Sequence, residues 1–440
     1  MRPRNRLSVL TGILCVVAVC CVSTSERSGE VVAEKEFVLG APAEVVLGLR
    51  ASVPGSDWGV ESREAAVVTV TVDGEYVEDI VLVGGDETLD YRVLLGPVTK
   101  GQHRLCVLLN EELSSPDVRQ VEIAGLTMAE YRPGDDLYEV VAHAPIIYYR
   151  RWSMDRSTDV PMLAYHQRSH SSDGTRIRYT VIFTHEDGGT PAPMLMSRWG
   201  RTTDIELIYD VAFDANGKIV RERYQGPGHA TPPFKGRKLG GHPLLRVCTS
   251  NNMVTDEFRD GPRVALAPVN ELSPGLPREA MMDANPWTYR AMAAEMRREE
   301  RTESPGDPAT AAVSDPRNYL YCDLSFVGLG RRQAIVAVRT RDGASFLSNH
   351  GQPGGAVTAG VARDSWSRAA VELPEATGPD DIERVDVKLL AGNGADAAGQ
   401  TQLAGARCLL LGSDYVPLPV LAAVTEKRAI PPAGLVVYER

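Results

Sequence analysis

Asp204 and Glu206, with Thr202 before them, are the residues whose type and spacing most clearly suggest chemistry. Successive side chains of a β-strand point to opposite faces, so residues two apart, such as these three, share one face. Two neighbouring carboxylates repel each other unless a cation, a proton or an arginine compensates. The pattern indicates a divalent-metal site with oxygen ligands, an acid/base pair, or a surface face neutralised by Arg198 or Arg201.

The sequence around this segment has further recognisable features. An aromatic strand ends at Asp187, residues 200–206 read Gly-Arg-Thr-Thr-Asp-Ile-Glu, and His229 follows after a second strand and a turn. In this order of features, residues 177–231 resemble the necrosis-inducing (cytolysin) protein family and the vacuolar-sorting-related β-sandwich proteins. Their motif, Gly-His-Arg-His-Asp-Trp-Glu, aligns with residues 200–206 without a gap. Here arginine and threonine stand in place of its two histidines, and isoleucine in place of its tryptophan.

The resemblance implies a β-sandwich for the middle of the chain and a bound cation. Asp187, Asp204 and Glu206 take the family's metal-binding positions, with His229 nearby. Oxygen ligands favour calcium, magnesium or manganese over zinc, because no thiolate and at most one histidine is at hand. The resemblance also implies a membrane-active protein as one functional alternative.

Laminarinase-like glycosidases offer a second comparison, because they carry a Glu-x-Asp-x-Glu array on one strand of a β jelly roll. Here Thr202 stands at the first glutamate position, so Asp204 and Glu206 lack a nucleophile on the same strand. Retaining hydrolysis needs two carboxyls about 5 Å apart. A carbohydrate-active enzyme, either a glycosidase or a lyase using Asp204 and Glu206, stays an alternative to a binding protein.

Other candidate groups are less specific. Tyr148, Tyr149 and Trp152 could form a platform for stacking sugar rings, although core packing is the more common use of such residues. His166 and His170 have a spacing that suits a helix-borne metal pair, but their surroundings indicate a loop with solvated histidines. Phosphate-binding loops, Gly-x-Ser-x-Gly and His-Glu-x-x-His motifs are absent from the sequence.

The N-terminus indicates the compartment. Three arginines precede an apolar run of about 16 residues at 7–22, which is short for a membrane span and right for a signal peptide. Small residues near position 25 offer a cleavage site. We therefore expect residues 1–25 to be a signal peptide and the protein to be secreted, periplasmic or on the cell surface. Alternatively, the exported protein carries a lipid anchor at Cys20 or Cys21.

The spacing of the cysteines does not indicate a metal site. Three of the seven lie in the apolar run, and the remaining four, Cys106, Cys248, Cys322 and Cys408, are widely spaced without a Cys-x-x-Cys pair. In an oxidising compartment one disulfide can form, and Cys322 with Cys408 is the favoured pair because both fall in one predicted domain. Buried free thiols are the equal alternative.

The 440 residues predict two to four domains of mainly β structure. Residues 30–134 contain about seven short strands, with a hairpin turn at Asp73-Gly74, which is typical of a β-sandwich. Residues 137–302 are predicted to form a central β-sandwich ending in a helix near 286–301. Residues 303–315 have the composition of a linker, and 316–440 return to the strands of a sandwich or jelly roll. The predicted fold is three consecutive β-sandwich or jelly-roll-like domains with one short helix between the second and third.

Composition and net charge limit the classes of partner that the protein is expected to bind. The 43% hydrophobic and 24% charged residues are ordinary for globular domains, and a net charge of −11 argues against nucleic acid as a partner. Beyond residue 25, no apolar run approaches the length of a transmembrane segment. We expect an exported β protein with a polar cleft in its central domain that binds an extracellular or cell-surface polysaccharide, with or without a divalent cation.

Overall fold

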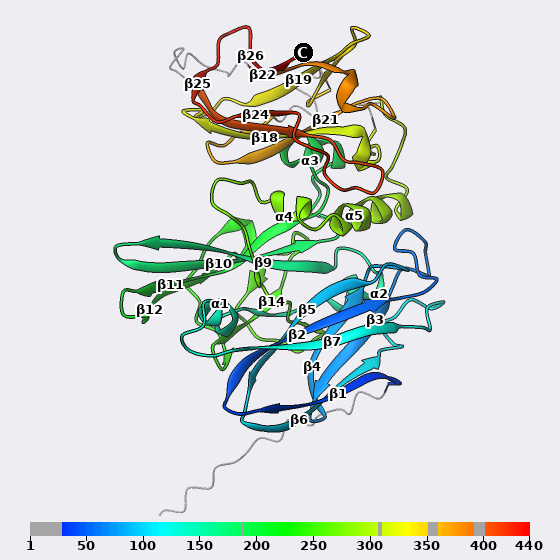
Figure 1. Cartoon of the computed structure of the whole chain (residues 1–440), viewed down its shortest axis with the longest axis vertical. Coiled ribbons are helices and arrows are strands. Elements are labelled where there is room, and N and C mark those ends of the chain that lie inside the picture. The colour runs from blue at the N-terminus through cyan, green and yellow to red at the C-terminus, as the bar shows by residue number, and fades with distance from the viewer. Residues whose placement is uncertain (1–28, 187, 307–309, 351–359, 391–400) are drawn as a thin grey trace, which may run out of the picture.

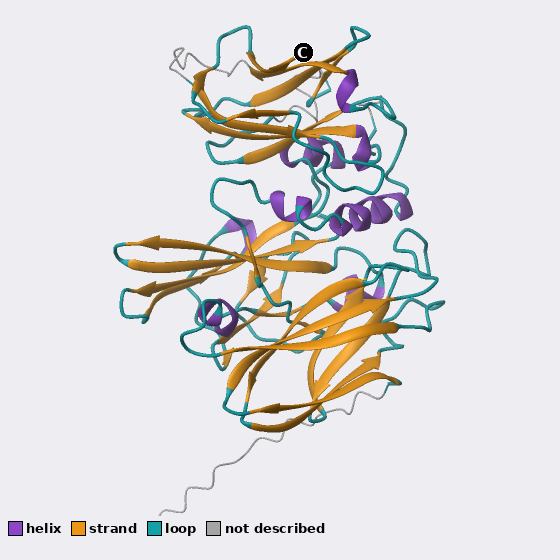
Figure 2. Ribbon diagram, in the orientation of Figure 1, coloured by secondary structure: helices purple, strands orange, loops and turns teal. Residues whose placement is uncertain are grey.

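The computed structural model describes residues 29–186, 188–306, 310–350, 360–390 and 401–440. Three β-rich units make up the structure: the C-terminal unit lies at one end of the longest axis, and the central and N-terminal units lie beside each other toward the other end (Figure 1). Helices are few and short (Figure 2). The predicted fold class, mainly β with several sandwich-like units, is confirmed. The predicted signal peptide, including Cys20 and Cys21, lies outside the described residues.

The N-terminal unit is a sandwich of seven strands. One sheet has the order β1 (Val31–Leu39), β6 (Gly101–Leu109), β3 (Ala66–Val72), β4 (Glu75–Leu82); the other has the order β5 (Leu89–Val98), β2 (Ala43–Ser52), β7 (Glu122–Tyr131). The predicted turn between β3 and β4 is confirmed, because Asp73 and Gly74 both have positive φ, 54° and 83°. Two such residues in a row give the twist that a two-residue hairpin needs.

The central unit also contains two sheets. The first has the order β12 (Ile219–Tyr224), β11 (Ile205–Asp214), β10 (Gly174–Phe183), β9 (Pro161–Ser171), β17 (Asn270–Glu271). The second has the order β13 (Lys238–Leu239), β14 (His242–Val247), β8 (Ile146–Tyr148), β16 (Arg263–Val264), with β15 (Val254–Thr255) beside β14. Helix α1 (Tyr138–Ala142) precedes β8 in the chain. Pro145 separates the two elements because it has no N–H to donate to a ladder.

More helices form than the sequence suggested. The predicted helix near 286–301 is α5 (Trp287–Arg298), and α2 (Arg151–Asp155), α3 (Ala192–Trp199) and α4 (Ala280–Asp283) were not expected. Within the described residues, three short 3-10 turns add to these: η1 (Pro227–His229), η2 (Pro316–Asn318) and η3 (Pro379–Asp381). Pro191 precedes α3 and Gly200 ends it in the left-handed conformation, with φ of 61°. Proline before a helix and glycine after it are its usual boundaries.

The C-terminal unit is a second sandwich. One sheet has the order β21 (Ser367–Glu372), β18 (Tyr319–Val327), β23 (Gln402–Leu409), β24 (Ala422–Val424), with β25 (Arg428–Ala429) beside β23. The other has the order β20 (Ser345–Leu347), β19 (Ala334–Thr340), β22 (Ile382–Leu389), β26 (Leu435–Glu439). Its core is formed by the inward-facing aliphatic residues of both sheets.

The units share buried contacts. One apolar cluster continues from Trp58 of the N-terminal sandwich through Met292 of α5 to Tyr321 of the C-terminal sandwich. Figure 1 shows α4 and α5 lying between the C-terminal unit and the two others. In the segment predicted as a linker, Glu303 and Val313 are joined by a backbone hydrogen bond of 3.0 Å. The exact domain boundaries stay predictions. Within the described part of the chain, no helix has the length and apolar character to cross a membrane.

Candidate functional site

Asp204 and Glu206 lie side by side, as the strand alternation predicts. Asp204 precedes β11 and Glu206 is the second residue of that strand, and their side chains are hydrogen-bonded to each other. Both are buried, with 1% and 7% of their surface exposed. The interpretation as an exposed surface face is therefore wrong.

A shared proton compensates the two carboxyls. Burial, and next the nearby charge of Glu206, raise the pKa of Asp204 to about 8. Burial also raises the pKa of Glu206, while the hydrogen bond from Asp204 acts in the opposite direction. At neutral pH, Asp204 therefore holds the proton and donates it to the Glu206 carboxylate.

Asn252 connects this pair to a second buried carboxylate. Its Nδ2 donates to Oδ2 of Asp204 at 2.9 Å and to Oδ1 of Asp159 at 2.8 Å. Its Oδ1 accepts from the Tyr149 hydroxyl at 2.9 Å and from Arg150 at 3.1 Å. The amide is thus fully engaged and holds both carboxylates in place. On the other side of the pair, the side-chain amide of Gln225 donates to the Glu206 carboxylate.

Arg201 and Arg198, which were expected to neutralise the carboxyl pair, make their contacts elsewhere. Arg201 donates through Nε to Glu279 at 2.9 Å and also to the carbonyl of Thr203. The guanidinium of Arg198 lies over the ring of Trp199, 5.4 Å from its centroid. Arg201 acts on the pair only through its charge, which lowers the carboxyl pKa values.

The other predicted metal ligands are only partly placed. Asp187 lies outside the described residues, and His229 is an exposed residue of η1. Glu186 is half-buried, and its pKa is raised by burial and then by the charge of Asp204, whereas His229 lowers it. Among the residues that the structure describes, no three histidine, cysteine, aspartate or glutamate side chains form a group that could hold a metal ion. The described residues therefore supply two touching carboxyls, and the four-residue metal site stays a prediction.

The geometry of the pair limits its chemistry. Carboxyls that hydrogen-bond to each other are closer than the roughly 5 Å of retaining glycosidases or the roughly 6.5–9.5 Å of inverting ones. A glycosidic bond does not fit between them. Asp204 and Glu206 can hold a proton or exchange it for a cation, but they do not form an acid and nucleophile pair.

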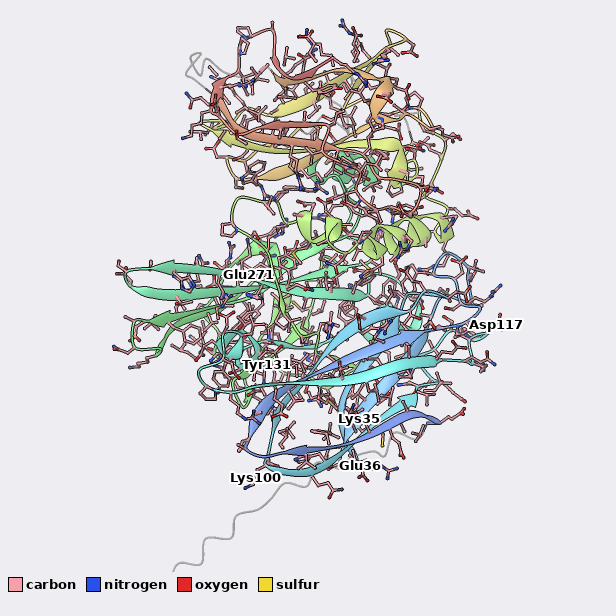
Figure 3. The ribbon with its side chains drawn as sticks, viewed as in Figure 1. Lys35, Glu36, Lys100, Asp117, Tyr131 and Glu271 are labelled. Carbon is pink, nitrogen blue, oxygen red and sulfur yellow. The ribbon has the colours of Figure 1, made fainter. Side chains whose placement is uncertain are left out.

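A groove between the N-terminal and central units is the second polar feature. Its volume is about 900 Å³. It is lined by Glu61, Ser62, Glu64, Glu112, Leu113, Ser114, Ser115, Pro116, Arg151, Trp152, Asp155, Arg156, Ser157, Thr158, Arg298 and Glu299. The N–H of Asp117, at the tip of the N-terminal sandwich in Figure 3, donates to the Ser62 carbonyl at 3.0 Å and ties together the two loops of one wall.

Trp152 is the exposed aromatic residue of this groove. Its surface is 49% exposed, and the guanidinium of Arg156 lies 4.7 Å from its ring centroid. Tyr148 and Tyr149 are buried in the core of the central unit. The expected three-residue aromatic platform is therefore wrong for the tyrosines, and only Trp152 faces a space that a ligand can enter.

The groove is polar and fixed by ion pairs. Arg151 on α2 donates to Asp155 at 3.0 Å and to Glu112 of the N-terminal unit at 2.8 Å, so it links both walls. Five carboxylates and three arginines are among the lining residues, which gives a formal excess of negative charge. This excess disfavours polyanionic ligands.

Thr158 joins the groove to the buried carboxyls. Its hydroxyl lies 2.9 Å from one carboxylate oxygen of Glu295 and 2.9 Å from one of Glu299. A hydroxyl has one hydrogen, so Thr158 lies between two carboxyls that share a single donor. The next residue, Asp159, is the partner of Asn252, which in turn reaches Asp204. The groove wall and the carboxyl pair are therefore parts of one polar network.

The predicted loop at His166 and His170 is wrong, because both lie on β9. His166 is buried with Nδ1 at 2.7 Å from the Pro268 carbonyl, and His170 is exposed beside the Thr175 hydroxyl at 3.0 Å. Residues four apart on a strand are separated by about 13 Å along it. These histidines therefore do not form a metal pair.

Comparisons with known proteins identify no family for this chain. No family model matches the chain, and no curated protein matches it. One solved structure, described as "EclA C-terminal domain; sugar-binding protein", is 17% identical, covers 24% of this chain and 71% of its own, and has a TM-score of 0.19. A second, described as "NLPPya in complex with mannosamine", is 12% identical, covers 32% of this chain and 74% of its own, and has a TM-score of 0.23. At these TM-scores neither likeness carries an argument about function.

Proposed function

We propose that this protein binds an extracellular saccharide in the groove between its N-terminal and central units and does not hydrolyse it. The observation that carries the proposal is the half-exposed indole of Trp152 in a groove of about 900 Å³ whose other lining residues, except Leu113 and Pro116, carry hydroxyl, carboxylate or guanidinium groups. A sugar ring offers an apolar C–H face to an aromatic surface, while its hydroxyls need fixed donors and acceptors around it.

The polar side chains of the groove are held in place before any ligand arrives. The Ser115 hydroxyl donates to Glu64 at 2.7 Å. Arg298 donates to the carbonyls of Trp58 and Ser157, each at 2.6 Å. Groups that are already ordered lose little conformational entropy on binding, which favours recognition of a weakly hydrophobic ligand such as a sugar.

The enzyme alternative has less support. A general acid must carry a proton and touch the bond that breaks. Burial raises the pKa of Asp204 to about 8 and that of Glu295 to about 7, yet both carboxyls are shielded from the groove by the residues around them. Glu112 and Asp155, which do line the groove, are ion-paired with Arg151. This arrangement supports binding better than hydrolysis.

A divalent cation at Asp204 and Glu206 is a separate proposal. It is supported by the buried, hydrogen-bonded carboxyl pair, in which a cation can replace the shared proton. The resemblance to the necrosis-inducing family adds Asp187 as a third oxygen ligand. Calcium, magnesium and manganese are the candidate ions.

The test of the proposed function is a glycan array probed with the full chain, followed by titration calorimetry on any glycan that binds. Trp152→Ala is expected to weaken binding about tenfold or more, which is a loss of about 1.4 kcal/mol or more. Phe258→Ala is the matched control, since Phe258 is 36% exposed, carries Arg237 over its ring at 4.6 Å and lies outside the groove. Unchanged binding by the Trp152 variant excludes the groove as the site.

Two further readouts separate the alternatives. Release of reducing ends from a bound glycan indicates a carbohydrate-active enzyme and not a binding protein. Leakage from lipid vesicles that lack glycans indicates the membrane-active alternative. We expect neither.

A further inference from the structure

Cys322 and Cys408 face each other across two neighbouring strands. Cys322 on β18 and Cys408 on β23 are direct partners in the antiparallel register. Both are fully buried, and their thiols are hydrogen-bonded to each other. The other described cysteines, Cys106 and Cys248, are half-buried and distant in the fold.

The backbone geometry of this pair suits a covalent bond. The Leu373 N–H donates to the Asn318 carbonyl at 2.8 Å, so Asn318 and every second residue after it on β18, including Cys322, bond toward β21. The Cys408 carbonyl accepts from Leu421 on the far side of β23. The two cysteines therefore form a non-hydrogen-bonded pair, in which Cα atoms lie about 4.5 Å apart. Disulfides span Cα separations of about 4.4–6.8 Å.

The pair lies next to the contacts that hold the C-terminal unit to the rest of the protein. Asp323, the neighbour of Cys322, accepts from Arg368 at 2.6 Å and from Arg407, the neighbour of Cys408, at 2.8 Å. Both arginines also donate to Asp283 of α4, at 2.7 Å and 2.6 Å. A covalent link here fixes the two central strands that present this charged cluster.

We propose that Cys322 and Cys408 form a disulfide when the chain folds in an oxidising compartment. The bond forms by exchange with the disulfide of an oxidised dithiol or of glutathione: the two cysteines lose their protons and form one S–S bond, and the oxidant is reduced to two thiols. Burial makes the folded thiols unreactive, so the exchange takes place before the sandwich closes. Once closed, the sandwich shields the bond from soluble reductants.

The experiment compares the full chain refolded from the reduced, unfolded state with oxidised glutathione and without it. After refolding with oxidant, denaturing alkylation is expected to label Cys106 and Cys248 and to leave Cys322 and Cys408 as one cross-linked peptide, with the mass lower by two hydrogen atoms. Alkylation of both Cys322 and Cys408 in that sample overturns the proposal.

Two variants keep the interpretation clear. Cys106→Ser with Cys248→Ser is expected to retain the cross-link. Cys322→Ser with Cys408→Ser is expected to lose it and to melt at one temperature with or without oxidant, whereas the oxidised wild type melts several degrees above its reduced form. Equal melting of oxidised and reduced wild type, with the cross-link absent, contradicts the proposal independently of whether the serine variant folds.

Discussion

The indole N–H of Trp58 donates to Oε2 of Glu295 at 2.9 Å, a hydrogen bond that joins the N-terminal sandwich to helix α5. The other oxygen of Glu295 accepts from the Asp159 N–H at 2.9 Å. One turn further on, Arg298 lies over the Trp58 ring, 5.0 Å from its centroid. A buried carboxyl whose two oxygens both accept hydrogen bonds, as in Glu295, fixes one relative orientation of the elements that it connects.

The first prediction concerns the proton on Glu295. Burial raises the pKa of Glu295 from its ordinary 4.5 to about 7, so the folded protein holds a proton that the unfolded chain releases. The contribution of Glu295 to the free energy of unfolding is therefore fully present below pH 4.5 and is lost as pH rises through about 7. Glu295→Gln, which keeps the size and an acceptor oxygen, is expected to remove this dependence, a difference on the order of 3 kcal/mol between the two ends of the range.

Urea unfolding at a series of pH values, about pH 5 to about pH 8, measures this difference. The control is Glu111→Gln, a change at an exposed carboxylate, which is expected to leave the pH profile of the wild type intact. A Glu295→Gln profile parallel to that of the wild type shows that Glu295 is already ionised in the folded protein at pH 5.

The second prediction concerns the buried arginine between the central and C-terminal units. Arg368 is fully buried and donates to both Asp283 and Asp323. Arg368→Leu leaves these carboxylates with Arg407 as their remaining arginine partner, and it is expected to lower the free energy of unfolding by about 3–5 kcal/mol. Arg339→Leu is the matched control, because Arg339 pairs with Glu383 at the surface at 2.9 Å, and such pairs contribute about 0–1 kcal/mol. Equal losses in both variants contradict a structural role for the buried cluster.

Local signals predicted much of the fold. The turn at Asp73-Gly74 and the strands around it follow from residues within a few positions of one another, so one sequence suffices. Helix α3 was missed although Pro191 and Gly200 mark its two ends. His166 was misplaced because the serines after it suggest a loop, whereas Gly174 with φ of 137° turns the chain into a β9–β10 hairpin.

The candidate site was predictable only where its residues are close in sequence. Asp204 and Glu206 share a face because they are two apart, and this was readable from the strand pattern. Asn252 and Gln225 reach them from other segments, 48 and 19 residues away. Trp152 lines a groove that exists only when the N-terminal and central units are packed together. Such contacts depend on tertiary packing, which composition and periodicity do not encode.

The third prediction tests the cation. If Asp204 and Glu206 exchange their shared proton for calcium, magnesium or manganese, millimolar amounts of the ion raise the melting temperature of the full chain by mass action. Asp204→Asn with Glu206→Gln is expected to abolish this rise. The control is Glu34→Gln with Glu36→Gln, a pair of exposed carboxylates with the same spacing on β1. Identical melting of the wild type in EDTA and in each of the three ions contradicts the proposed cation site.

The fourth prediction concerns the segment expected to be a linker. Residues 310 and 311 are exposed, and Pro305 and Gly306 precede them without regular secondary structure, so a protease of broad specificity is expected to cut first between 305 and 311. The two fragments are expected to stay together on size-exclusion chromatography, because Asp283 on one side of the cut is held by Arg368 and Arg407 on the other. In the Arg368→Leu variant the nicked fragments separate more readily in urea. A first cut within 67–83 shows that the boundary lies elsewhere, and immediate separation of the wild-type fragments shows that the buried cluster does not hold the C-terminal unit in place.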